Sequence, residues 1–198
     1  MSAIVYELGG NLYINLTNRC PCDCVFCVRN SGDGIGSADN LWLEREPTAA
    51  EVIAELEQYD WAKYGEIVFC GFGEPTCALP VLLDVAGRIK SPGVRTRLNT
   101  NGLGDLINGR PVAPLLQGLI DSVSVSLNAP DAKRYAELCR PQYGESAFAA
   151  MLEFAADCLN YIPNVTLSVV DTISASEIES CRLAAERAGV PLRVREFM

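Results

Sequence analysis

Short runs of β-branched and aliphatic residues recur along the chain, separated by longer stretches of mixed polarity. Such runs are typical of strands inside a parallel sheet, where both faces are covered by apolar neighbours. The pattern predicts six strands, at residues 12–16, 67–70, 94–98, 122–127, 165–170 and 192–194.

The stretches between these strands carry helix signals. Thr48 and Glu51 form a capping-box pattern ahead of apolar residues that recur at helical spacing. Ser174 and Glu177 repeat the capping box, and the helix that they start is expected to end at Gly189. Helices are therefore expected at residues 48–61, 78–90, 130–138, 146–161 and after residue 174.

Alternating strands and helices predict an α/β fold with parallel strands and right-handed crossovers. Six such units are too few to close an eight-stranded barrel, so the sequence predicts an open partial barrel, a (β/α)6 TIM-like arrangement. With 198 residues, 49% of them hydrophobic, and no low-complexity stretch, residues 1–198 are expected to form a single domain. Functional groups are expected at the carboxyl ends of the strands.

Three cysteines follow the first predicted strand. Cys20, Cys24 and Cys27 form the pattern C-x3-C-x2-C. Structural zinc ions and ordinary iron–sulfur clusters take four protein ligands. A group of three therefore indicates a four-iron cluster with one iron left open to a ligand from outside the protein, and that iron is a place for chemistry.

The segment TNRCPCDCVFC resembles the cluster loop of the radical S-adenosylmethionine (SAM) enzymes, in which an aromatic residue, here Phe26, precedes the third cysteine. GFGEP at 71–75 resembles the GGEP motif of that family, and LNTNG at 98–102 follows at the matching spacing. The longer stretches YELGGNLYINLTNRC, SVSVSLNAPDAKRYAELCRP and RVREF are similar to TatD-associated radical SAM proteins. In one departure, Phe72 occupies the position of the first glycine of GGEP.

The resemblance implies a partial barrel that holds one 4Fe–4S cluster on Cys20, Cys24 and Cys27, with SAM at the open iron. It implies reductive cleavage of SAM to methionine and a 5′-deoxyadenosyl radical that abstracts hydrogen from a substrate. An external one-electron reductant of the flavodoxin or ferredoxin type is expected, and the TatD association suggests a pathway shared with a TatD-type hydrolase. SAM contacts are expected from Phe26, Gly73, Glu74, Pro75, Asn99, Ser126, Asn128 and Asp171.

These expected contacts differ in kind. The small residues of GFGEP allow backbone carbonyls to approach the methionine ammonium, Pro75 stiffens the turn, and Glu74 offers a carboxylate. The resemblance assigns the four polar residues near strand ends to the ribose hydroxyls or the methionine carboxylate. The alternative is turn chemistry, in which such side chains satisfy nearby backbone groups.

Charge and composition exclude several classes of protein. A net charge of −9 argues against a broad nucleic-acid surface, and the absence of histidine excludes Ser-His-Asp and Cys-His hydrolases and the zinc deaminases. No signal region is present, and no apolar run approaches the ~20 residues that cross a bilayer, so a cytoplasmic location without membrane contact is expected. The clustered cysteines favour metal ligation in a reducing compartment. The remaining cysteines are expected to be buried small hydrophobes: Cys70, Cys77, Cys139, Cys158 and Cys181.

Other interpretations stay open. Cys20, Cys22, Cys24 and Cys27 would also suit a four-thiolate zinc or iron–sulfur binding module without catalysis, whereas the three-thiolate interpretation makes Cys22 a spectator. Within the radical SAM group, a compact chain suits a glycyl-radical activase that acts on a protein partner. It also suits a synthase that acts on a nucleoside-like molecule.

The stretch 29–46 is long for a compact domain, and such loops at a catalytic rim are often lids or substrate contacts. Its glycines resemble a phosphate-binding loop but precede no helix start, so a flexible loop is favoured. Trp42 is a candidate either to anchor a substrate or to pack this loop down, and packing is favoured. Arg29, Arg140 and Arg195 are candidates for binding a small anionic substrate or a peptide carboxylate. The reason is that guanidinium groups recognise carboxylate and phosphate in a bidentate way.

Overall fold

A computed structural model describes residues 2–196 of the chain. Within that range one sheet contains seven strands, arranged in chain order, and it stays open between its edge strands β1 and β7. β1 and β2 are antiparallel, and each later pair of neighbours is parallel. The strands are β1 (Val5–Leu8), β2 (Asn11–Ile14), β3 (Ile67–Phe69), β4 (Thr96–Thr100), β5 (Ser122–Ser126), β6 (Asn164–Val170) and β7 (Leu192–Arg195).

The six predicted strands correspond to β2 to β7, and the prediction of an open, partly closed barrel is confirmed. The strand β1 was not predicted. Gly9 and Gly10 have φ angles of 56° and 77°, so they form the two-residue turn that brings β1 back against β2 as a hairpin. The third predicted strand was placed too early, because β4 begins only at Thr96.

The helices are α1 (Ala49–Leu56), α2 (Leu79–Ile89), α3 (Gly104–Asn108), α4 (Ala132–Cys139), α5 (Ser146–Cys158) and α6 (Ala175–Arg187). Both predicted capping boxes are present, at the starts of α1 and α6. The helix predicted over residues 48–61 is shorter, and α3 was not predicted. Among residues 2–196, no helix combines the length and apolar character needed to cross a bilayer.

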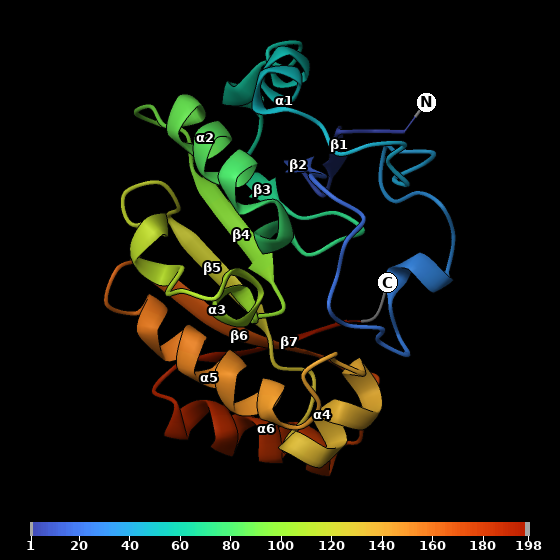
Figure 1. Ribbon diagram of the computed structural model, residues 1–198, viewed down its shortest axis with the longest axis vertical. Helices are drawn as coiled ribbons and strands as arrows, with labels where there is room; N and C mark the ends of the chain where they lie inside the picture. Colours follow the sequence, from blue (N-terminus) through green and yellow to red (C-terminus); the bar gives the residue numbers. More distant parts are fainter. Residues whose placement is uncertain (1, 197–198) are drawn as a thin grey trace.

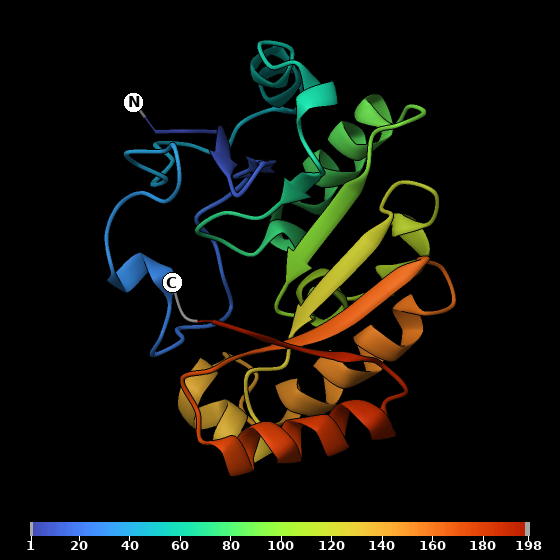
Figure 2. The same ribbon diagram turned by 180° about the vertical axis from the view of Figure 1, so that it is seen from behind.

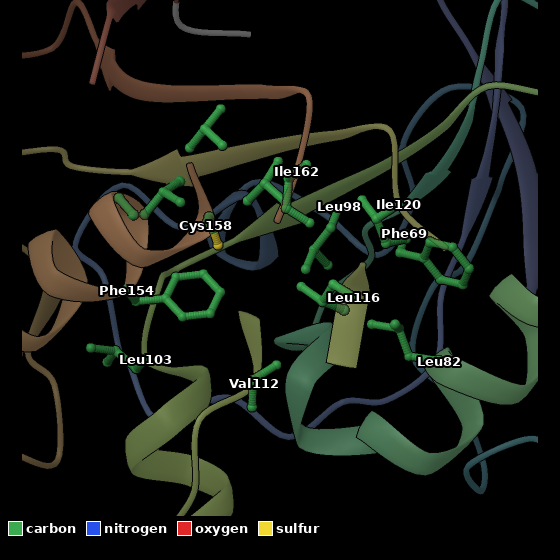
Figure 3. Packing of buried hydrophobic residues seen from close by; sticks show 14 of the residues in the cluster. Phe69, Leu82, Leu98, Leu103, Val112, Leu116, Ile120, Phe154, Cys158 and Ile162 are labelled. Atoms are coloured by element: carbon green, nitrogen blue, oxygen red, sulfur yellow. The ribbon is translucent and has the colours of Figure 1, made fainter. Parts of the chain in front are cut away.

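The helices cover one face of the sheet. In Figure 1, α2, α3 and α5 lie in front of the strands. In the view from behind, no helix lies over the opposite face of β4, β5 and β6 (Figure 2). Phe69 and Leu98 from the strands, Leu82 from α2 and Phe154 from α5 pack together in the helix-covered layer, each at most 1% exposed (Figure 3). Burial of this apolar surface stabilises the fold.

The other face of the sheet is polar. Burial alternates along β4 and β5, because successive side chains of a strand point to opposite faces. Leu98 faces the helices. Arg97 and Asn99, on either side of it in β4, point to the opposite face, which Ser124 and Ser126 of β5 also line. The expectation that both strand faces are apolar is therefore wrong for these two strands. The polar face forms the inner wall of the open barrel.

Candidate functional site

The carboxyl ends of β2, β3 and β4 meet at one rim of the sheet, as expected for parallel strands. The loop after β2 carries the cysteines, and the Arg19 carbonyl in it accepts a hydrogen bond from the Glu74 backbone N–H over 2.8 Å. Asn101, after β4, places its Nδ2 3.9 Å from the Sγ of Cys20. Three separate loops are therefore in direct contact around the cysteines.

Glu74 connects these loops through hydrogen bonds. Its buried carboxylate accepts hydrogen bonds from the backbone N–H and hydroxyl of Thr76, from the hydroxyl of Thr100 and from the backbone N–H of Asn101, over 2.7 to 3.1 Å. Burial raises the pKa of Glu74, and these hydrogen bonds oppose the rise. The carboxylate thus joins the end of β3 to the end of β4.

Glycine is required at position 73 because the loop after β3 lies directly on the cysteine loop. A Cβ at Gly73 would lie 2.2 Å from the Thr17 carbonyl oxygen, and one at Gly71 would lie 2.1 Å from Asn15 Oδ1. Neither position has room for a side chain. Phe72 points elsewhere and is 3% exposed, which explains how this motif tolerates a large residue between two glycines.

Trp42 holds the 29–46 loop against Phe72. The two rings meet edge to face, with their centroids 5.0 Å apart, and Trp42 Nε1 donates to Asp33 Oδ1 over 3.1 Å. The guanidinium carbon of Arg29 lies 5.9 Å from the centroid of the Trp42 ring, within cation–π range. Trp42 therefore packs this loop down, as predicted.

The three motif cysteines are partly exposed on the loop after β2. Arg29 Nε donates to the Sγ of Cys27 over 3.3 Å. Hydrogen bonds from the Cys139 and Cys22 side chains, and then the charge of Arg29, lower the pKa of Cys24 to about 4. Thiolates with nearby N–H donors are the ligands that iron–sulfur clusters take.

Cys22 is buried beside these thiols, with its Sγ 3.8 Å from Asn101 Nδ2. Among residues 2–196, no three Cys, His, Asp or Glu side chains are grouped closely enough to share one metal ion. Of the other five cysteines, Cys139, Cys158 and Cys181 are buried as predicted. The prediction is wrong for Cys70 and Cys77, which are partly exposed.

A cavity of about 940 Å³ lies against the polar face of the sheet, beside these loops. Five of the predicted SAM contacts line it: Gly73, Glu74, Pro75, Asn99 and Ser126. The Oδ1 atom of Asn99 is buried without a hydrogen-bond partner within the described residues, so it is available to a polar ligand. Arg97 and Arg193 also line the cavity, although neither was predicted as a site residue.

The other three predicted contacts do not line this cavity. Phe26 packs, half-buried, against the main core. Asn128 lies with its Nδ2 3.8 Å from the Sγ of Cys139, and the backbone N–H of Asp171 donates to the carbonyl of Arg195 over 3.0 Å. Asn128 and Asp171 thus lie close to the site without bordering its main opening.

The candidate anion-binding arginines lie in three different environments. Arg140 is exposed at the end of α4, outside the lining of the cavity, with its Nη1 3.8 Å from Asp23 Oδ2. Arg29 lies beside Cys27, as described above. Arg195 lines the cavity, and burial lowers its pKa. Arg140 thus lies beside the cysteine loop and outside this cavity, and its role in binding an anion stays a prediction.

The family model of the radical SAM superfamily matches residues 14–180. The chain belongs to the radical SAM superfamily. Membership implies a 4Fe–4S cluster and SAM as cofactors. The thiols of Cys20, Cys24 and Cys27 fit the cluster, because one loop presents all three and N–H donors lie close to the sulfur atoms of Cys20 and Cys27. This radical SAM site also offers unpartnered polar groups where a cofactor would lie.

Curated relatives of this radical SAM chain include GTP 3′,8-cyclase of Corynebacterium glutamicum, which is 32% identical over 144 residues, covering 68% of this chain and 35% of the relative. GTP 3′,8-cyclase 2 of Mycobacterium tuberculosis is 27% identical over 199 residues, covering 97% of this chain and 51% of the relative. The chain thus spans about a third to a half of the length of these relatives.

Two solved structures share the radical SAM fold. The SAM-bound crystal structure of Streptococcus suis SuiB has a TM-score of 0.62 and 15% identity, covering 94% of this chain and 38% of that one. A radical SAM methyltransferase from Sphaerobacter thermophilus has a TM-score of 0.51 and 18% identity, covering 97% of this chain and 68% of that one. At these identities the likeness concerns the fold.

Proposed function

We propose that this chain uses a 4Fe–4S cluster on Cys20, Cys24 and Cys27 to cleave SAM and to abstract hydrogen from a small anionic substrate. The observation that carries the proposal is that the GFGEP loop and the ends of β4 and β5 line one cavity, and that Asn101 in this lining places its Nδ2 3.9 Å from the Sγ of Cys20. When bound and reduced by a flavodoxin or ferredoxin, the cluster supplies the electron that cleaves SAM to methionine and a 5′-deoxyadenosyl radical.

The residues of this chain bind and orient the cofactor. The close approach at Gly73 sets the GFGEP loop against the cysteine loop, and Glu74 keeps that loop in register with β4. Asn99 and Ser126 border the cavity as polar contacts for the ribose or the methionine carboxylate. In this assignment Glu74 acts as a positioning residue, because its carboxylate oxygens already accept four hydrogen bonds.

The anionic substrate is proposed from the arginines of the cavity, above all Arg195. The names of the curated relatives specify GTP, a nucleotide that carries several negative charges, and this agrees with an anionic class. Similarity of the longer sequence stretches supports assignment to the TatD-associated group, with a TatD-type hydrolase in the same pathway. A cytoplasmic location belongs to the same proposal.

Anaerobic reconstitution tests the proposed reaction. The protein should bind about four irons with matching sulfide. With a one-electron reductant, it should convert SAM to 5′-deoxyadenosine and methionine, measured by chromatography against a Cys24→Ser control. A product consisting only of S-adenosylhomocysteine would indicate methyl transfer and refute the proposed reaction.

A further inference from the structure

We propose that Arg97, Arg193 and Arg195 form one subsite for a phosphate group of the substrate. We call these three residues the arginine cluster. The proposal rests on the proposed function, since it assumes that the substrate occupies the cavity that the cluster lines. It narrows the substrate class from small anions in general to phosphorylated molecules.

The arginine cluster combines one residue from the middle of the sheet with two residues from one edge strand. Arg97 belongs to β4, in the middle of the sheet, whereas Arg193 and Arg195 belong to the edge strand β7 (Figure 2). All three side chains line the same cavity. Burial is the main cause that lowers the pKa of Arg195, and the positive charges of Arg193 and Arg97 lower it further. The charge of Arg195 thus interacts unfavourably with those of both other arginines, and the nearby Cys70 and Tyr13 side chains partly offset this effect.

The charges of the cluster are only partly balanced. Arg97 pairs with Glu66 over 3.2 Å. Arg195 Nε is buried and has no hydrogen-bond partner among the described residues, and neither Arg193 nor Arg195 forms an ion pair there. A buried charged donor without a partner is costly, so a bound anion would relieve both the missing hydrogen bond and the repulsion.

Acidic side chains also line the cavity, but within the described residues none of them accepts a hydrogen bond from Arg195 Nε. Glu66 is engaged by Arg97. The Glu74 carboxylate is satisfied by the hydroxyl and backbone donors at the rim. Glu196 is exposed to solvent, where its charge is screened. Arg195 Nε thus has no acceptor within residues 2–196 in spite of these neighbours.

The number of guanidinium groups favours phosphate over carboxylate. One guanidinium fork is enough to engage both oxygens of a carboxylate. A phosphate presents more oxygens and a second negative charge, so it can accept from forks that approach from different strands. A cluster drawn from β4 and β7 matches that larger acceptor, in a chain whose net charge is −9.

Equilibrium binding of simple anions to the anaerobically reconstituted protein tests the subsite. We expect inorganic phosphate and pyrophosphate to bind the wild type more tightly than acetate does. Arg195→Met should weaken phosphate binding by about tenfold, the loss of a charge-assisted fork, while Arg195→Lys should recover part of it. The control is Arg88→Met, because Arg88 is exposed and paired with Asp84 on α2. This control should bind phosphate as the wild type does.

Thermal unfolding gives a second measurement that does not depend on SAM chemistry. In phosphate-free buffer, Arg195→Met should melt higher than the wild type, because a buried Nε donor without a partner among the described residues is removed. Added phosphate should raise the melting temperature of the wild type by more than it raises that of the variant. A variant that fails to fold would be replaced by Arg195→Gln, judged on the same two measurements.

Three results would overturn the subsite: acetate binding as tightly as phosphate, Arg195→Met keeping full phosphate affinity, or Arg195→Met losing SAM affinity in parallel. The last would assign Arg195 to the cofactor. A protein that binds phosphate as expected but never cleaves SAM would refute the proposed function and leave the subsite standing, so the two failures are distinguishable.

Discussion

Arg29 donates a hydrogen bond from its Nε to the Sγ of Cys27 over 3.3 Å. The same guanidinium lies over the ring of Trp42, which fixes its direction. A hydrogen bond to a ligand sulfur stabilises the reduced, more negative cluster and so raises its reduction potential. In the proposed cluster Cys27 is a ligand, so Arg29 would link the 29–46 loop to the electronic properties of that cluster.

Arg29→Met should lower the reduction potential of the cluster by about 60 mV, the equivalent of one charge-assisted hydrogen bond of about 1.4 kcal/mol in a one-electron couple. A redox titration followed by electron paramagnetic resonance measures the shift. Arg45→Met is the matched control, because Arg45 is exposed and paired with Glu51 away from the cysteines. An unchanged potential at full iron content would show that the Arg29–Cys27 contact has no electronic role.

Gly73→Ala should destabilise the protein by about 2 kcal/mol or more, because the new Cβ would lie 2.2 Å from the Thr17 carbonyl oxygen and would force the two loops apart. Urea unfolding measures the change. Gly87→Ala is the control, because Gly87 lies inside α2 with nothing within 4 Å of its added Cβ. It should stabilise the protein by up to about 1 kcal/mol. Equal effects of the two substitutions would contradict the close approach.

Glu74→Gln should change how stability depends on pH. Burial raises the pKa of Glu74 above its usual value of 4.5, so the folded protein holds this proton more tightly than the unfolded chain does. The contribution of Glu74 is therefore fully present below pH 4.5 and is lost as the pH rises through the folded pKa. The wild type should lose stability relative to Glu74→Gln over that rise, measured by urea unfolding at successive pH values. A constant difference between the two proteins would contradict the raised pKa.

Cys24→Ser should lose most of the reconstituted iron, whereas Cys22→Ser should keep it, because Cys20, Cys24 and Cys27 have the three-thiolate spacing. Iron and sulfide analysis after anaerobic reconstitution measures both variants. The comparison is a strict test of the ligand assignment, because Cys22 is buried beside Asn101 and lies near the same thiols. Equal loss of iron from the two variants would favour the four-thiolate module instead.

Local patterns in the sequence were sufficient for several features. Thr48 with Glu51 and Ser174 with Glu177 form the expected capping boxes, because a capping box depends on residues three positions apart. The apolar runs located β2 to β7. The assignment of Cys20, Cys24 and Cys27 as cluster ligands rests on their spacing within one loop and stays a prediction. The parallel direction of β2 to β7 was predicted from the alternation of strands and helices, since helical crossovers bring successive strands back in the same direction.

Only the tertiary structure decided which polar residues meet. Asn99 and Asn128 both follow strand signals, yet Asn99 lines the cavity and Asn128 lies against Cys139. Arg97 joins Arg195 in one cavity although 98 positions separate them in the sequence, because β4 and β7 belong to the same curved sheet. The face on which a strand residue lies depends on pairing register, and a shift of one residue reverses it. Register is set by contacts between distant segments, which no local pattern in the sequence specifies.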